Sequence, residues 1–246
     1  VFNNIKTKEG LILIYSKTIK ITHVCFSNIS RVDTGSTLAL LIYFGVNEPT
    51  FGEFIYSSAS GCTDVYKTSI YCLYKLDSMI NHFDGSIRFQ CINSTHSNSP
   101  SILILSDCQC VTMQMNTFSH LSSSYCLYFR NIQTSNNYCG MNNFFNNNCT
   151  YYFVCMEACS TYNATFENCI FCDFNINLNS YFVFGGSVIV INCVFDQSLI
   201  NLQPSVSASN CVAVNNPTSL ILAHFSTEKV CLGEINENAF GCRDKN

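Results

Sequence analysis

The sequence predicts an all-β fold, a right-handed parallel β-helix with irregular coils and Asn- and Ser-rich corners. Three observations predict it: short apolar runs, a recurring phrase centred on Cys, and a composition poor in charge. The chain has 246 residues, of which 11% are charged, while 17 are Cys, 29 are Asn and 29 are Ser. An ordinary soluble domain has about 25% charged residues, so neutral polar side chains here replace charged ones.

The apolar runs favour strands over helices because they are short and rich in β-branched and aromatic residues. Residues 11–15 and 187–191 are typical, and the good helix formers Ala, Glu and Lys are scarce. From the middle of the chain onward, the spacing between successive runs is irregular and widens. An irregular period of this kind is typical of a solenoid in which each coil adds a strand or two to parallel sheets. These runs begin at Ser101, Ser124, Thr150, Ser180 and Ser219.

A second repeat places Asn or another polar residue before Cys and an apolar residue after it. It is clearest at Asn168–Phe171 and Asn192–Phe195. Equivalent residues on neighbouring coils stack about 4.8 Å apart, which lies within the Cα separation that a disulfide requires. We therefore predict disulfides or a Cys ladder, with thiol or disulfide form left open, that includes Cys108, Cys169, Cys193 and Cys211.

Stacking also accounts for the low charge and the abundant Asn. Like charges would repel one another along a ladder, whereas Phe and Ile would fill the interior. Asn tolerates left-handed backbone geometry and can bond to an Asn one coil away, so Asn is expected at the corners. Residues 142–148 are predicted to form one such corner.

The alternative architecture is an antiparallel sandwich or barrel, which needs alternating strands joined by Asn-Gly or Asp-Gly turns. The chain has one such dipeptide, Asp84-Gly85. We predict a single β-helix domain over residues 1–246, with a loop insertion around residues 45–81 where the repeat is hard to align. Because no leader follows Val1, either a signal has been removed or the chain is a piece of a longer one.

The Cys content predicts an oxidising compartment, hence a secreted or cell-surface protein with disulfides. The alternative is a reduced protein that uses Cys as a small apolar side chain. An odd count leaves at least one Cys outside an internal pair. Four Asn-x-Ser/Thr sites are candidates for glycosylation, although chance alone gives about five in this composition. These sites are Asn28, Asn93, Asn148 and Asn163.

Several functional classes are disfavoured. The net charge is −4 and the 12 Lys and Arg are scattered, which argues against a nucleic-acid partner. No apolar run reaches the length of a membrane span. Closely spaced Cys pairs are flanked by apolar strands instead of basic residues, so we expect neither a zinc site nor another metal or cofactor.

Parallel β-helices also carry polysaccharide lyases and hydrolases, and a carbohydrate-active enzyme is the alternative function. Such enzymes need clustered carboxylates with basic residues nearby. Asp107, Asp173 and Asp196 adjoin Cys phrases, yet no Lys or Arg lies within thirty residues of the last two. We therefore expect exposed corner residues here, no catalytic residues, and no enzyme.

With the phrases Asn168–Phe171 and Asn192–Phe195 and the strand rhythm of residues 101–225, the chain resembles the Cys- and Asn-rich parallel β-helix proteins on the surfaces of protist parasites such as trichomonads. Those proteins are similar to the polymorphic outer-membrane proteins. The nearest match to their Gly-Gly-Ala-Ile motif is Gly185–Val188. The resemblance implies a large extracellular protein that acts in surface structure or adhesion.

The ends of a β-helix are open sheet edges that can pair with another copy. We therefore expect a non-enzymatic structural or adhesive protein whose partners are other protein chains. Homo-assembly into a filament or surface array is the expected form, and glycans are further ligands. An unpaired Cys would provide an intermolecular link.

Overall fold

The protein is a parallel β-helix, as the sequence predicts. The computed structural model describes residues 2–7, 12–15, 18–31, 39–45, 51–62, 68–73, 86–96, 98, 101–106, 110–130, 137–157, 163–172, 175–176, 181–196 and 205–215. Every regular element in these ranges is a strand, and the strands pair in parallel. No helix in the described ranges is long and apolar enough to cross a membrane.

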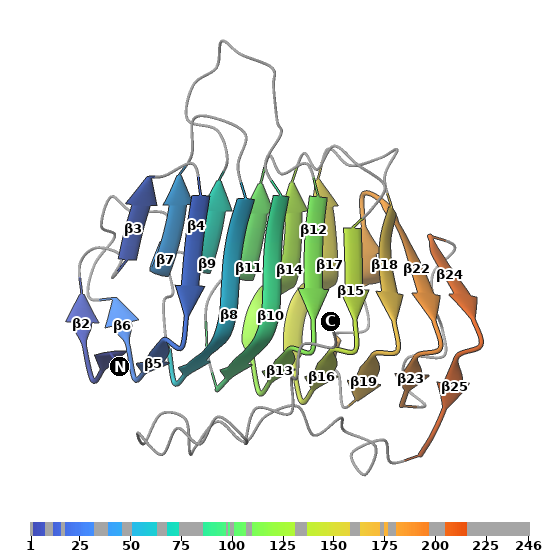
Figure 1. Cartoon of the computed structure of the whole chain (residues 1–246). Helices are drawn as coiled ribbons and strands as arrows, with labels where there is room; N and C mark the ends of the chain where they lie inside the picture. The colour runs from blue at the N-terminus through green and yellow to red at the C-terminus, as the bar shows by residue number, and fades with distance from the viewer. Residues whose placement is uncertain are drawn as a thin grey trace.

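The described strands form three faces, which follow one another along the chain (Figure 1). The first face consists of β4 (Thr18–Thr22), the first half of β8 (Phe51–Ser60), the first half of β10 (Ser86–Thr95), β12 (Cys110–Gln114), β15 (Asn137–Gly140), β18 (Asn163–Glu167), β22 (Ser187–Ile191) and β24 (Val206–Ser209).

The second face is narrow and continues the first across a bend. It consists of β1 (Phe2–Asn3), β5 (Cys25–Ser27), the second halves of β8 and β10, β13 (Thr117–Ser119), β16 (Asn143–Phe145), β19 (Ile170–Cys172), β23 (Val194–Phe195) and β25 (Val212–Ala213).

The third face lies behind the first in Figure 1. It consists of β3 (Ile12–Tyr15), β7 (Ala39–Gly45), β9 (Thr68–Leu73), β11 (Ser101–Ser106), β14 (Ser122–Arg130), β17 (Asn148–Glu157), β20 (Asn175–Ile176) and β21 (Tyr181–Phe184). Two short strands, β2 (Lys6–Thr7) and β6 (Ser30–Arg31), pair with each other.

The strand register confirms that the coils differ in length. Tyr138 pairs with Thr165, whereas Val188 pairs with Val206, which lies much closer to it along the chain. The clearest copies of the Cys phrase are equivalent on neighbouring coils, because β19 pairs with β23. The repeat is therefore defined by the bends and the strands between them, and the connections outside the strands absorb the variation.

Part of the segment predicted as a loop insertion, residues 45–81, belongs to the regular coil. Residues 51–60 form β8, which pairs with β4, β5 and β10, and residues 68–73 form β9, which pairs with β7 and β11. Residues 46–50, 63–67 and 74–85 lie outside the described part of the chain. The repeat was missed here because β8 runs through the bend without an Asn or Cys phrase to mark it.

Left-handed residues mark the two bends on either side of the second face. Asn is common there, as predicted, but His, Met and Cys also occur. Residues 142–148, predicted as one corner, span β16 and parts of the bends on both sides of it. The first bend has positive φ at His23, Cys91, Met115, Met141, Asn168, Asn192 and Asn210; the second has it at Asn4, Asn28, Gly61, His96, His120 and Asn146.

Stacked Phe rings fill the interior, as the ladder interpretation predicts. Phe118, Phe144, Phe171 and Phe195 form one continuous stack, with neighbouring ring centroids 5.3, 5.2 and 5.0 Å apart and planes within 9° of parallel. Phe153 of the third face meets this stack edge-on, 4.9 Å from Phe144. The core is thus held by aromatic contacts between coils and between faces.

Candidate functional site

A column of inward-facing polar side chains follows the first bend. A left-handed residue interrupts the sheet ladder, which leaves the next backbone N–H pointing into the coil, and a buried N–H needs an acceptor. The side chain one coil further on supplies it. Val24 N donates to Ser57 Oγ at 3.2 Å, and Ile92 N donates to Asn116 Oδ1 at 2.8 Å.

The column continues through Asn into Cys. Asn116 N donates to Asn142 Oδ1 at 3.0 Å, and Asn142 N donates to Cys169 Sγ at 3.4 Å. Each Asn also donates from Nδ2 to a backbone carbonyl, Asn116 to Phe89 O at 3.3 Å and Asn142 to Met113 O at 3.1 Å. The phrase Asn-Cys therefore has a structural meaning: its first residue makes the bend, and its second lies in the column.

Three of the predicted ladder cysteines, Cys169, Cys193 and Cys211, form the end of this column, and all three are thiols in this structure. Each sulfur lies within hydrogen-bonding distance of the carbonyl two residues before it and of one on a preceding coil, so its single S–H has more than one acceptor within reach. Cys193 Sγ, for example, lies 3.3 Å from Ile191 O and 3.5 Å from Phe166 O. The column is thus a ladder of hydrogen-bonded thiols.

Disulfides are less common among the described cysteines than the Cys count predicts. Cys91 is disulfide-bonded, to a partner whose side chain lies outside those described, and Cys108 also lies outside the described residues. The other cysteines whose side chains the structure describes are thiols that are buried or partly buried, as suits a small apolar side chain. They are Cys25, Cys62, Cys126, Cys139, Cys149, Cys155, Cys169, Cys172, Cys193 and Cys211.

The four predicted glycosylation sites differ in accessibility. Asn28 and Asn148 are exposed, and Asn163 is partly exposed on the first face. Asn28 Nδ2 donates to Asn4 Oδ1 at 3.1 Å, in the ladder of the second bend. Asn93 is buried, with 7% of its surface exposed, so a glycan on its side chain does not fit the folded coil.

The carboxylates do not converge in the described part of the chain. Asp107 and Asp173 lie outside the described residues, and Asp196 is buried instead of exposed as predicted. Its position explains the difference, because Asp196 N donates to Phe171 O at 3.0 Å, which continues the ladder of the second face beyond β23. Among the described residues, no group of three or more His, Cys, Asp or Glu could hold a metal ion.

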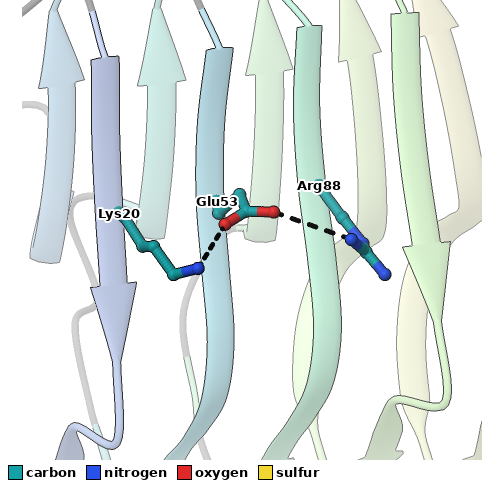
Figure 2. Close-up of polar contacts among 3 residues, drawn as sticks. All are labelled: Lys20, Glu53 and Arg88. Atoms are coloured by element: carbon teal, nitrogen blue, oxygen red, sulfur yellow. Dashed lines mark ion pairs between the residues drawn. The ribbon is translucent and has the colours of Figure 1, made fainter. Parts of the chain in front are cut away.

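Charged side chains instead form a row across the first face. Glu53 on β8 lies between Lys20 on β4 and Arg88 on β10, with carboxylate-to-nitrogen distances of 3.0 and 3.6 Å (Figure 2). The register places these three residues on equivalent positions of three coils. Alternating sign along the axis converts the repulsion of a like-charge ladder into attraction.

Further along the same row, Tyr138 lies across Gly140. A Cβ atom at Gly140 would clash with the Tyr138 hydroxyl, so the missing side chain makes room for the ring. Burial, and the hydrogen bond that the hydroxyl donates to Glu167, raise the pKa of Tyr138 to about 12. The first face is thus tied together by polar contacts between coils.

The third face carries an aromatic strip, defined here as Tyr125, Tyr128, Tyr151, Tyr152 and Phe184. The Tyr125 ring stacks on Tyr128 and on Tyr152, at centroid distances of 5.4 and 6.1 Å, and Tyr152 stacks on Phe184 at 4.8 Å. Tyr151 and Phe184 are 55% and 50% exposed. Three coils therefore present a contiguous, accessible aromatic surface.

A β-bulge assembles this strip. Ser123 pairs with Cys149 and Tyr125 pairs with Tyr152, so Ser124 lies opposite two residues of β17. The bulge breaks the alternation of in and out, which lets Tyr151 and Tyr152 both reach the surface. Sequence reasoning missed the strip because the bulge shifts the register; the clustered Tyr of residues 125–128 and 151–152 is the signal that could have indicated it.

Comparison with known proteins gives no family. No protein-family model matches the chain, and no curated protein matches it. The solved structure of QnrB1, a plasmid-mediated fluoroquinolone resistance protein, is similar at 12% sequence identity and a TM-score of 0.18. The alignment covers 83% of this chain and 95% of the QnrB1 chain. A similarity this low carries no argument about function, so the functional conclusion depends on the chain's own residues.

Proposed function

We propose that this chain is a non-enzymatic, extracellular structural protein that assembles with copies of itself through the aromatic strip of the third face. The observation that carries the proposal is the exposure of Tyr151 and Phe184 beside three further aromatic rings. Contiguous exposed aromatic surface is characteristic of protein interfaces, where Tyr contributes strongly to binding.

The chemistry of the strip suits contact with a second copy. A two-fold interface requires a patch that complements itself. A Tyr hydroxyl both donates and accepts hydrogen bonds, so the Tyr residues of the strip can pair with their own equivalents. Glu157 is the charged residue described at this end of β17, and its repulsion across a two-fold axis is weak if it lies at the rim.

The strip is also held against a packed core, which favours assembly. Its strands pair in parallel on either side of the bulge, and the side chains behind it belong to the core, including Leu127, Phe153 and Val183. Little conformational entropy is lost when such a surface docks, because the rings are already held against each other. A lateral pair of β-helices, with axes side by side, is the assembly that this face supports.

The test is the oligomeric state in solution. Sedimentation equilibrium over a wide range of concentration is expected to show self-association, which the Tyr151→Ala/Phe184→Ala double variant weakens by about tenfold or more. The matched control is Phe51→Ala, which removes a ring that is 43% exposed on the first face. A wild-type monomer throughout the range, or equal weakening by the control, contradicts the proposal.

Extracellular location has its own test. Glycopeptide mass spectrometry of native material is expected to find glycans at one or more of Asn28, Asn148 and Asn163, and none at the buried Asn93. The Asn-Cys phrases that resemble those of parasite surface proteins support the same location. Unmodified Asn at all four positions in material from its natural source contradicts it.

A further inference from the structure

We propose that the thiol column is a site of oxidative modification, in which Cys193 and Cys211 form a disulfide that links β22–β23 to β24–β25. The two residues hold equivalent positions on neighbouring coils, each directly after a left-handed Asn and each donating to the carbonyl two residues before it. Val212 N donates to Cys193 O at 3.0 Å, which fixes the two backbones one strand spacing apart.

This spacing suits a disulfide. Hydrogen-bonded parallel strands lie about 4.8 Å apart, and the Cα atoms of a disulfide are about 4.4–6.8 Å apart. The two Sγ atoms point the same way from the column, since Cys193 Sγ reaches Phe166 O and Cys211 Sγ reaches the equivalent Val190 O. Side-chain rotation can therefore join the sulfurs without moving the coils apart.

Exposure decides which thiol reacts first. Cys169 and Cys193 are completely buried, whereas Cys211 is partly exposed at the end of the column. A small disulfide reagent can therefore reach Cys211 before the two thiols behind it. Cys126 and Cys149 form a second thiol pair inside the coil, and both are completely buried, so they provide an internal comparison.

The chemistry is a double thiol–disulfide exchange with a low-molecular-weight disulfide. The Cys211 thiolate attacks one sulfur of the reagent, which breaks its S–S bond and releases one reduced thiol. The Cys193 thiolate then attacks Cys211 Sγ, forms the protein disulfide and releases the second reduced thiol. Two electrons and two protons pass from the protein to the reagent.

The ionisation of both thiols is consistent with these roles. A hydrogen bond from the Cys169 thiol lowers the pKa of Cys193, which suits it to the second attack. Desolvation raises the pKa of Cys211, so the first attack is expected to accelerate as the pH rises above neutral.

The disulfide would join the two last described coils, where many side chains are exposed. The β24–β25 coil exposes Ser207, Ala208, Val212 and Ala213, and its step from β22 is the shortest in the described register. Local opening is easiest in such poorly covered elements. A disulfide here would hold the last described coil closed without altering the buried core.

The experiment treats the reduced protein with oxidised glutathione, quenches it with a thiol-alkylating reagent, and digests it with a protease that cleaves after Asp and Glu. Cleavage after Asp173, Asp196 and Glu228 places Cys193 and Cys211 in separate peptides, each with no other Cys. The expected product joins residues 174–196 to residues 197–228, with a loss of about 2 Da relative to the two thiol peptides.

Serine variants provide the controls, because Ser57 occupies the equivalent position of this column and shows that serine fits there. Cys193→Ser is expected to stop at a glutathione adduct on Cys211. Cys211→Ser is expected to leave Cys193 reduced, and Cys169→Ser to form the Cys193–Cys211 link as wild type does.

Three results would overturn the proposal. The first is a link between Cys169 and Cys193 in place of the expected one. The second is oxidation of the buried Cys126 and Cys149 at the same rate, which would show that exposure does not direct the reaction. The third is a wild-type protein that stays fully reduced after treatment.

Discussion

Asn116 and Asn142 are joined twice across neighbouring coils, because the backbone N–H and the side-chain Nδ2 of Asn116 both donate to Asn142 Oδ1, at 3.0 and 2.9 Å. Both residues are completely buried. One side-chain oxygen therefore satisfies two donors that have no access to water, and the stability of the first bend depends on it.

Replacing Asn142 with Ala is expected to destabilise the protein by about 2–3 kcal/mol, since it removes the acceptor for the buried Asn116 N–H. Asn142→Cys is expected to cost less, because Cys169 already accepts the equivalent N–H one coil later. Urea unfolding of both variants measures the difference. As a control, Asn148→Ala alters an exposed side chain and is expected to change stability by less than about 0.5 kcal/mol. Equal losses for Ala and Cys at position 142 would show that the acceptor is unimportant.

Phe171 contacts several other rings in the core, including Phe144 at 5.2 Å and Phe195 at 5.0 Å. Phe171→Ala is expected to lower the free energy of unfolding by about 3–5 kcal/mol, through lost burial and the cavity that remains. Phe51→Ala, at an exposed position, provides the comparison and is expected to have a much smaller effect. Chemical denaturation gives both values, and similar losses for the two variants would contradict the stacked core.

Gly185 and Gly186 differ in what surrounds them. Gly185 has φ +83°, and a Cβ there would lie 2.5 Å from the Met156 carbonyl oxygen, whereas a Cβ at Gly186, which has no positive φ, would meet side-chain atoms of Met156 at 2.8 Å or more. Gly185→Ala is therefore expected to cost about 1–3 kcal/mol through backbone strain. Gly186→Ala is expected to cost less. Thermal unfolding of the two variants side by side measures the order, and the reverse order would refute the explanation.

Tyr138 predicts a loss of stability in alkali. Its pKa is raised to about 12 in the folded state by burial and by the hydrogen bond to Glu167, against about 10 when unfolded. The folded state therefore favours the protonated phenol. Its contribution is complete below about pH 10 and is lost as the pH rises from about 10 to about 12. Unfolding free energies of wild type and Tyr138→Phe across this range give the measurement; parallel pH profiles would show that Tyr138 does not contribute.

Sequence periodicity predicts much of this fold because the two bends recur on most of the described coils. The Asn-Cys phrases at 168–169 and 192–193 identify equivalent positions, since Asn adopts the left-handed bend and Cys occupies the column. The Asn-Cys phrase does not identify a bend where other residue types adopt the left-handed conformation or occupy the column. Met115 and Met141 are left-handed at the first bend, and nothing in the sequence marks a Met as such a position.

The candidate site is less predictable than the fold. Its rings come from β14, β17 and β21, which are far apart in the sequence and adjacent only through the register, and a bulge sets which Tyr reaches the surface. Amino-acid composition also cannot predict whether a given Cys is a thiol or part of a disulfide, because this depends on the hydrogen-bond acceptors and the exposure of each sulfur. Asp196 is buried although a polar corner residue is expected to be exposed.

The repeated bends also determine how such a chain can grow. Because the N–H after a left-handed residue is accepted by the following coil, as Asn116 N is by Asn142, duplication of a complete coil of this kind keeps the pattern, while a partial coil leaves the bends out of step. Each added coil lengthens the axis by about 4.8 Å. The protein's reach therefore changes in equal increments, and duplication of one coil is a means of adjusting the distance it spans while its cross-section stays constant.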